Sequence, residues 1–104
     1  MNLHERERAI ENKYAHDQEV LFKIIAKRNK LLGFWAADQM KLSPSEAENY
    51  ANTITEMAVD ANGLLSLVDK ILHDLTTCGA DIDIKDISQQ MFHFESLARK
   101  QILG

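Results

Sequence analysis

Residues that can end a helix are rare in this chain and stand at only a few places. The 104 residues include one proline, Pro44, and four glycines. Between these positions, apolar side chains recur every three or four residues, which is the spacing of one face of an α-helix. Strict alternation, the pattern of a strand, covers only residues 81–84. The sequence therefore predicts an all-α fold.

Two stretches have the residues that begin helices. Ser43 can cap a helix that has Pro44 at its first position, and Glu46 stands where a capping box needs an acidic side chain. Asp83 can cap a last helix that begins at Ile84. These starts predict helices after residues 43 and 83.

Glycines predict the remaining breaks. Asn62-Gly63 indicates a turn, and Gly79 stands where a helix would place its C-cap glycine. Cys78, the last apolar step before Gly79, is expected to be buried or half-buried. Four helices result. We expect their core to hold Trp35, largely buried, with Leu31, Leu32, Ile54, Val68 and Ile87.

The first helical segment is much longer than the other three. From Leu3 to Met40 only Gly33 opposes a helix, by ~1 kcal/mol relative to alanine. A straight helix of this length would span ~57 Å, against ~24–30 Å for the others. Its first residues must protrude from the bundle or fold back after a break. His16-Asp17 is the expected joint, because Asp17 can act as an N-cap.

The start of this segment has little apolar surface. Residues 2–18 contain three large apolar side chains, at Leu3, Ile10 and Tyr14, whereas residues 20–35 contain nine. A short, polar helix is marginal in water and would be held weakly to a bundle. We therefore predict a single domain over residues 1–104: a four-helix bundle at 17–104 with a mobile N-terminal helical arm at 1–16.

Composition argues against several function classes. The formal net charge is −4 and there is no long basic run, so we expect no binding to nucleic acid. No apolar run approaches the roughly 18 residues that a membrane helix needs, so we expect no membrane insertion. The polar first twenty residues and the single cysteine indicate a cytoplasmic protein.

No catalytic, cofactor or metal motif is present. The histidines are not spaced with Cys78 as metal ligands, and no glycine-rich loop could hold a phosphate. We expect no enzyme activity, no cofactor and no metal. The basic residues Lys27, Arg28 and Lys30 are typical of a solvated helix face. The alternative is that they contact a ligand or second partner, as in a small helical module that binds an adenine nucleotide.

Two stretches are specific enough to suggest a family. They are residues 6–17, RERAIENKYAHD, and residues 28–37, RNKLLGFWAA. The chain resembles the zeta subunits, which are inhibitor-type subunits of the alphaproteobacterial rotary ATP synthase. The resemblance is dense over residues 5–37 and looser beyond them. Ile10 and Tyr14 stand where the family usually has phenylalanine-like residues, and Leu3 stands where an aromatic residue is common.

The resemblance implies a regulator of ATP hydrolysis. In inhibitory members the N-terminal arm enters a catalytic alpha–beta interface of the soluble head, against the gamma subunit, and blocks rotation. Other members keep the fold without inhibiting. In this chain the arm would supply apolar anchors and charged residues that set its register in the partner. These partner-binding residues would be Leu3, Arg6, Arg8, Ile10, Glu11, Lys13 and Tyr14.

Overall fold

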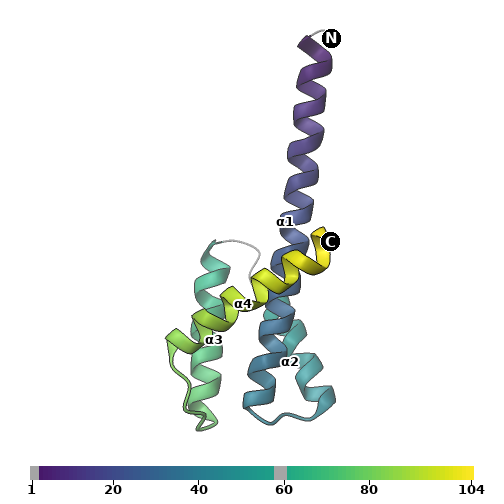
Figure 1. The fold of residues 1–104 in the computed structure, drawn as a ribbon. Helices are drawn as coiled ribbons and strands as arrows, with labels where there is room; N and C mark the ends of the chain where they lie inside the picture. The colour runs from purple at the N-terminus through teal and green to yellow at the C-terminus, as the bar shows by residue number, and fades with distance from the viewer. Residues whose placement is uncertain (1–2, 58–60) are drawn as a thin grey trace.

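The computed structural model describes the backbone of residues 3–57 and 61–104 and the side chains of residues 17–57 and 66–104. It contains four helices, α1 (Leu3–Gln39), α2 (Pro44–Met57), α3 (Ala61–Thr77) and α4 (Ile84–Leu103) (Figure 1). No strand occurs in these described ranges. The predicted all-α class and the four-helix count are confirmed.

The long helix α1 determines the shape of the molecule. It runs for 37 residues without a break at His16-Asp17, which corresponds to ~55 Å at 1.5 Å per residue. The molecule measures 62 Å along its longest axis and 25 Å along the next. Figure 1 shows the first half of α1 extending beyond the other helices, while its second half packs among them. The chain therefore protrudes and does not fold back. The mobility of residues 1–16 stays a prediction.

Ser43 and Asp83 cap α2 and α4 as predicted, but in α2 the Glu46 carboxylate accepts the Ser43 hydroxyl and not the Ser43 amide that a capping box requires. The Ser43 hydroxyl accepts the Glu46 amide at 3.3 Å and donates to the Glu46 carboxylate at 2.8 Å. At α4, the Asp83 carboxylate accepts the Asp86 amide at 3.0 Å, and the Asp86 carboxylate accepts the Asp83 amide at 3.1 Å. Asp83 and Asp86 thus form a complete capping box.

Both α1 and α3 end at a residue in the left-handed conformation. Gly79 has φ 84°, and the amide after it donates to the Leu75 carbonyl at 3.0 Å. Lys41 has φ 58°, and the amide after it donates to the Ala37 carbonyl at 3.1 Å. This is the hydrogen bond that closes a Schellman motif. The predicted C-cap role of Gly79 is confirmed, whereas Lys41 adopts the same conformation against its steric preference.

Two sequence-based expectations are wrong near α3. Asn62-Gly63 is in the first turn of α3, because this helix begins at Ala61. Cys78 is exposed. Cys78 lies in the turn that follows α3, and its Sγ donates to the Leu75 carbonyl at 3.2 Å.

The core lies where the second half of α1 meets the other helices. Trp35 and Val68 pack against it but are only partly buried. Trp35 thus contributes to this core as expected, with part of its surface exposed, since a ring of this size is rarely covered completely. The expectation was right for Leu32, Ile54 and Ile87, which are fully buried, and wrong for Leu31, which is partly buried and lies outside the cluster. The complete buried cluster is Leu32, Ala36, Ile54, Leu67, Ile71, Leu75 and Ile87.

The backbones of α1 and α2 come into close contact at Gly33. A Cβ atom added to Gly33 would lie 2.8 Å from the Ala51 Cα and 3.3 Å from the Ile54 Cβ. Glycine weakens a helix interior by ~1 kcal/mol. Here its missing side chain allows the two helices to approach.

A polar cluster joins α2 to α3. The Tyr50 hydroxyl donates to Asp74 Oδ2 at 2.9 Å, and Lys70 Nζ lies 3.0 Å from the same oxygen. Burial, followed by the hydrogen bond and negative charge of Asp74, raises the pKa of Tyr50 well above its usual value. Tyr50 therefore keeps its proton in the folded protein.

Candidate functional site

The predicted partner-binding residues belong to the first half of α1. Their backbone is helical and continuous with the part of α1 that forms the core. Their side chains lie outside the described residues, so their role as partner contacts stays a prediction. These residues are Leu3, Arg6, Arg8, Ile10, Glu11, Lys13 and Tyr14.

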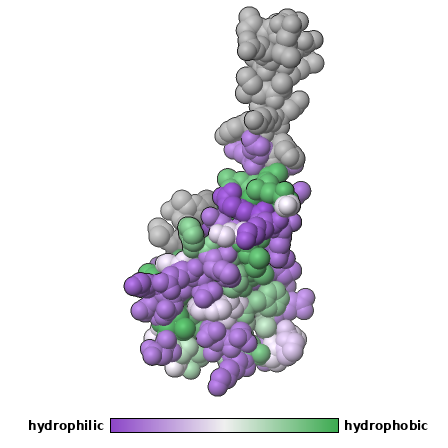
Figure 2. Space-filling view, viewed as in Figure 1, coloured by the Kyte–Doolittle hydropathy of each residue, from purple (hydrophilic) through white to green (hydrophobic). Residues whose placement is uncertain are grey.

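An exposed apolar surface surrounds the place where α1 leaves the bundle. Leu21 is 45 % exposed and Phe22 is 59 % exposed. The end of α4 lies beside this part of α1 (Figure 1), and its Leu103 is 63 % exposed. We call Leu21, Phe22 and Leu103 the neck patch. Figure 2 shows hydrophobic surface at this level of the molecule.

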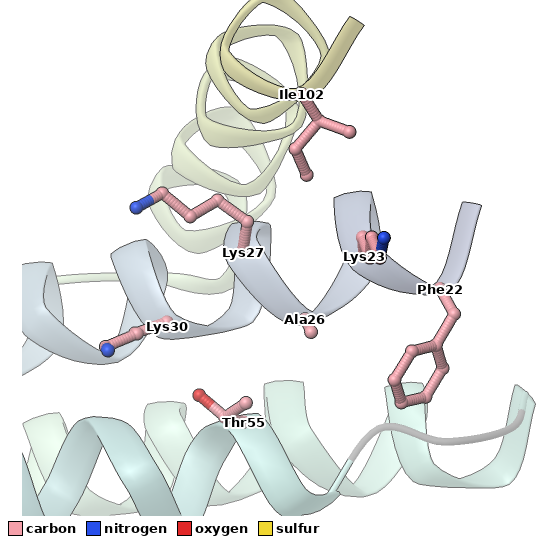
Figure 3. Close-up of a pocket in the computed structure, with 7 residues that line it drawn as sticks. All are labelled: Phe22, Lys23, Ala26, Lys27, Lys30, Thr55 and Ile102. Carbon is pink, nitrogen blue, oxygen red and sulfur yellow. The ribbon is translucent and has the colours of Figure 1, made fainter. Parts of the chain in front are cut away.

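The second predicted site, the basic run on α1, is divided between two surfaces. Lys27 and Lys30 line a pocket of about 420 Å³ between α1, α2 and the end of α4 (Figure 3). Figure 3 shows the lysine side chains at this pocket pointing in different directions, so their ammonium groups do not converge. The full lining is Phe22, Lys23, Ala26, Lys27, Lys30, Thr55 and Ile102.

Arg28 does not belong to this pocket or to a solvated face. It is 7 % exposed, and its Nη1 donates to Glu95 Oε1 of α4 at 3.2 Å. The expectation of a solvated face was wrong for this residue. Arg28 lies four residues after Ile24 and three before Leu31, within the apolar stripe of α1, so the helix turns it inward.

Asn29 is a buried hydrogen-bond partner of Arg28 that the sequence analysis did not identify. It is fully buried, and its Oδ1 accepts Arg28 Nε at 3.1 Å and Nη2 at 3.0 Å. Its Nδ2 has no hydrogen-bond partner among the described residues, a state that typically costs ~1–3 kcal/mol. The burial of Asn29 could have been predicted from its helical spacing, since it lies four residues after Ile25 and three before Leu32.

The described part of the chain offers neither a metal-binding cluster nor a membrane-spanning helix. There, no group of three or more His, Cys, Asp or Glu side chains could hold a metal ion. In the same residues, no helix combines the length and hydropathy that a membrane crossing requires.

A helical bundle extended by one long helix is an architecture suited to regulation by contact. Comparison with models of protein families matches residues 1–101 to the family described as ATPase inhibitor subunit zeta. The chain belongs to this family, and the resemblance seen in its sequence is confirmed. The family description indicates an inhibitory, regulatory role. No curated protein and no solved structure gives a match.

Proposed function

We propose that this protein binds the soluble catalytic head of a rotary ATP synthase in the cytoplasm and inhibits its hydrolysis of ATP. Residues 1–16 insert at a catalytic interface between alpha and beta subunits, against the gamma subunit. The protein catalyses nothing itself, because an inserted helix stops rotation by occupying space.

The observation that carries this proposal is the length of α1. It has 37 residues, whereas the next longest helix, α4, has 20. A bundle of the shorter helices cannot cover the first half of α1 along its length. That half is available to a partner, and it contains one of the two stretches that resemble the family.

Insertion couples the ordering of the arm to binding. Contacts of Leu3, Ile10 and Tyr14 must offset the conformational entropy that the arm loses. Arg6 and Arg8 would act mainly on the rate of association, since exposed charges steer an encounter and are screened by salt. The bundle, 25 Å across in the second dimension, is wider than the single helix of the arm, about 10–12 Å, and so would limit the depth of insertion.

Deletion of residues 1–14 tests the proposal. Full-length protein should inhibit ATP hydrolysis by the cognate isolated head, and the deleted protein should not, while both melt at nearly the same temperature. A variant with Ile10→Ala and Tyr14→Ala should lose roughly 2–4 kcal/mol of binding free energy if both side chains are anchors. Equal inhibition by full-length and deleted protein would instead place the active surface on the bundle.

Two other results of this experiment have definite meanings. Absence of inhibition by the full-length protein, together with binding to the head, would make it a member that keeps the fold without inhibiting. Absence of binding would refute the proposal.

A second candidate function is the binding of an adenine nucleotide. The pocket beside Phe22 supports it, because an aromatic ring and lysine side chains could contact a base and phosphates. The divergence of the lysines in Figure 3 weakens it. Calorimetric titration with ATP should show binding that is lost in Lys27→Ala with Lys30→Ala and kept in the exposed control Lys85→Ala.

A further inference from the structure

We propose that the neck patch is a second contact surface for the same ATPase, joined to the surface of the arm. The face of α1 that contacts the ATPase then extends to Leu21, beyond the boundary between arm and bundle at residues 16 and 17. This inference rests on the proposed function, and its occupant is an apolar surface of the head at the mouth of the interface that the arm enters.

The first support is exposure. Leu21, Phe22 and Leu103 are 45 %, 59 % and 63 % exposed and come from two helices that meet at one level of the molecule. A single exposed leucine needs no explanation, but a group of large apolar side chains is typical of an interaction site. Ile102 extends the group into the adjoining pocket, which Phe22 also lines.

The second support is helical register. Leu21 follows Leu3 by 18 residues, which is five full turns at 3.6 residues per turn, and α1 is unbroken between them. Tyr14 and Ile10 precede Leu21 by 7 and 11 residues, spacings that also return to this side of the helix. The apolar stripe predicted for the arm therefore continues into the neck patch without a change of face.

The third support is continuity. Leu21 lies only ~10 Å along the helix axis beyond Tyr14. When the arm is inserted up to the bundle, the neck patch lies at the edge of the interface that the arm enters. The surface of the partner around this edge then contacts the neck patch. Asp17 and Glu19, both exposed, border it on the side of the arm. They suit basic residues on the partner's rim.

The experiment compares two variants in full-length protein. The neck variant carries Leu21→Ser, Phe22→Ser and Leu103→Ser. The control carries Ile84→Ser and Phe92→Ser, which change equally exposed side chains (53 % and 74 %) elsewhere on α4. Both should keep the parent's melting temperature within a few degrees, since they change exposed residues.

Binding to the isolated head and inhibition of its ATP hydrolysis are both titrated. The neck variant should lose about tenfold or more in affinity, while the control matches the parent. Equal affinity of neck variant and parent would overturn this inference and leave the arm proposal intact. A parent that does not bind the head would overturn both. If sedimentation shows a dimer of the parent that only the neck variant abolishes, with binding to the head unchanged, the patch is a self-association surface and the inference is wrong.

Discussion

Replacing Gly33 by alanine tests whether the close approach of α1 and α2 holds the bundle together. The residue is buried in the last third of α1, and an added Cβ would lie 2.8 Å from the Ala51 Cα. Helix propensity alone predicts that alanine stabilises the protein by ~1 kcal/mol. The structure predicts the opposite sign.

The magnitude follows from the contact distances. Ordinary carbon contacts are at ~3.5–4.0 Å, so the new methyl group is too close by ~0.7 Å. Its neighbour is a backbone atom, so α1 and α2 must move apart around Leu32 and Ile54. A gap of 0.5–1 Å forfeits about a quarter to a half of each dispersion contact, and overpacking typically costs ~1–3 kcal/mol. After the propensity gain, we expect a net loss of about 1 kcal/mol in the free energy of unfolding.

Urea denaturation followed by circular dichroism measures this loss, and thermal denaturation should show a fall in Tm of about 4–8 °C. Lys30 provides the control, because it is exposed on the same helix. Lys30→Ala should be more stable than Lys30→Gly by ~1 kcal/mol, which isolates the propensity effect. A Gly33→Ala protein as stable as the parent, or more stable, would refute the close approach.

Four further perturbations test particular interactions by denaturation. Lys41→Gly should stabilise by about 0.5–1 kcal/mol and Gly79→Ala should destabilise by about 1 kcal/mol, because both positions have a positive φ; the opposite signs would contradict the two C-caps. Glu95→Ala should cost about 1–2 kcal/mol, less than a fully buried pair, because Glu95 is one-third exposed while Arg28 is buried; no loss would mean that water replaces the carboxylate. The raised pKa of Tyr50 means that stability is complete below pH ~10 and falls above it by up to ~1.4 kcal/mol per pH unit, as the unfolded chain ionises first. Between pH 8 and pH 11, Tyr50→Phe should therefore lose less of its free energy of unfolding than the parent does. An equal loss in both proteins would contradict the raised pKa of Tyr50.

The parts of the fold that were predictable are those that local chemistry determines. Asp83 caps α4 through its own carboxylate, and Gly79 ends α3 because it accepts a positive φ. Neither depends on distant residues. The Lys41 cap was not predictable in this way, since a lysine disfavours the positive φ that Lys41 adopts.

Predictions failed where the neighbours in space decide the outcome. Helical spacing suggested burial of Cys78, but Cys78 lies in the turn after α3 and is exposed. Composition suggested that Arg28 is solvated, but α4 brings Glu95 within 3.2 Å of it. The neck patch could not be predicted from the sequence either, since the exposure of Leu21 depends on where the other helices stop covering α1.

The residues that carry the resemblance have separable roles in this structure. In residues 28–37, Arg28, Asn29, Leu32 and Gly33 are all buried where α1 meets its neighbours, so packing explains this stretch. The proposed contacts with the ATPase lie outside it, in residues 3–22 and at Leu103. Substitutions of the buried residues within 28–37 should therefore change stability, and substitutions of the proposed contacts should change inhibition. A Gly33→Ala protein assayed well below its Tm should inhibit ATP hydrolysis as the parent does, although it unfolds more easily. Weaker inhibition by this folded variant would show that the α1–α2 contact takes part in binding and would contradict the division.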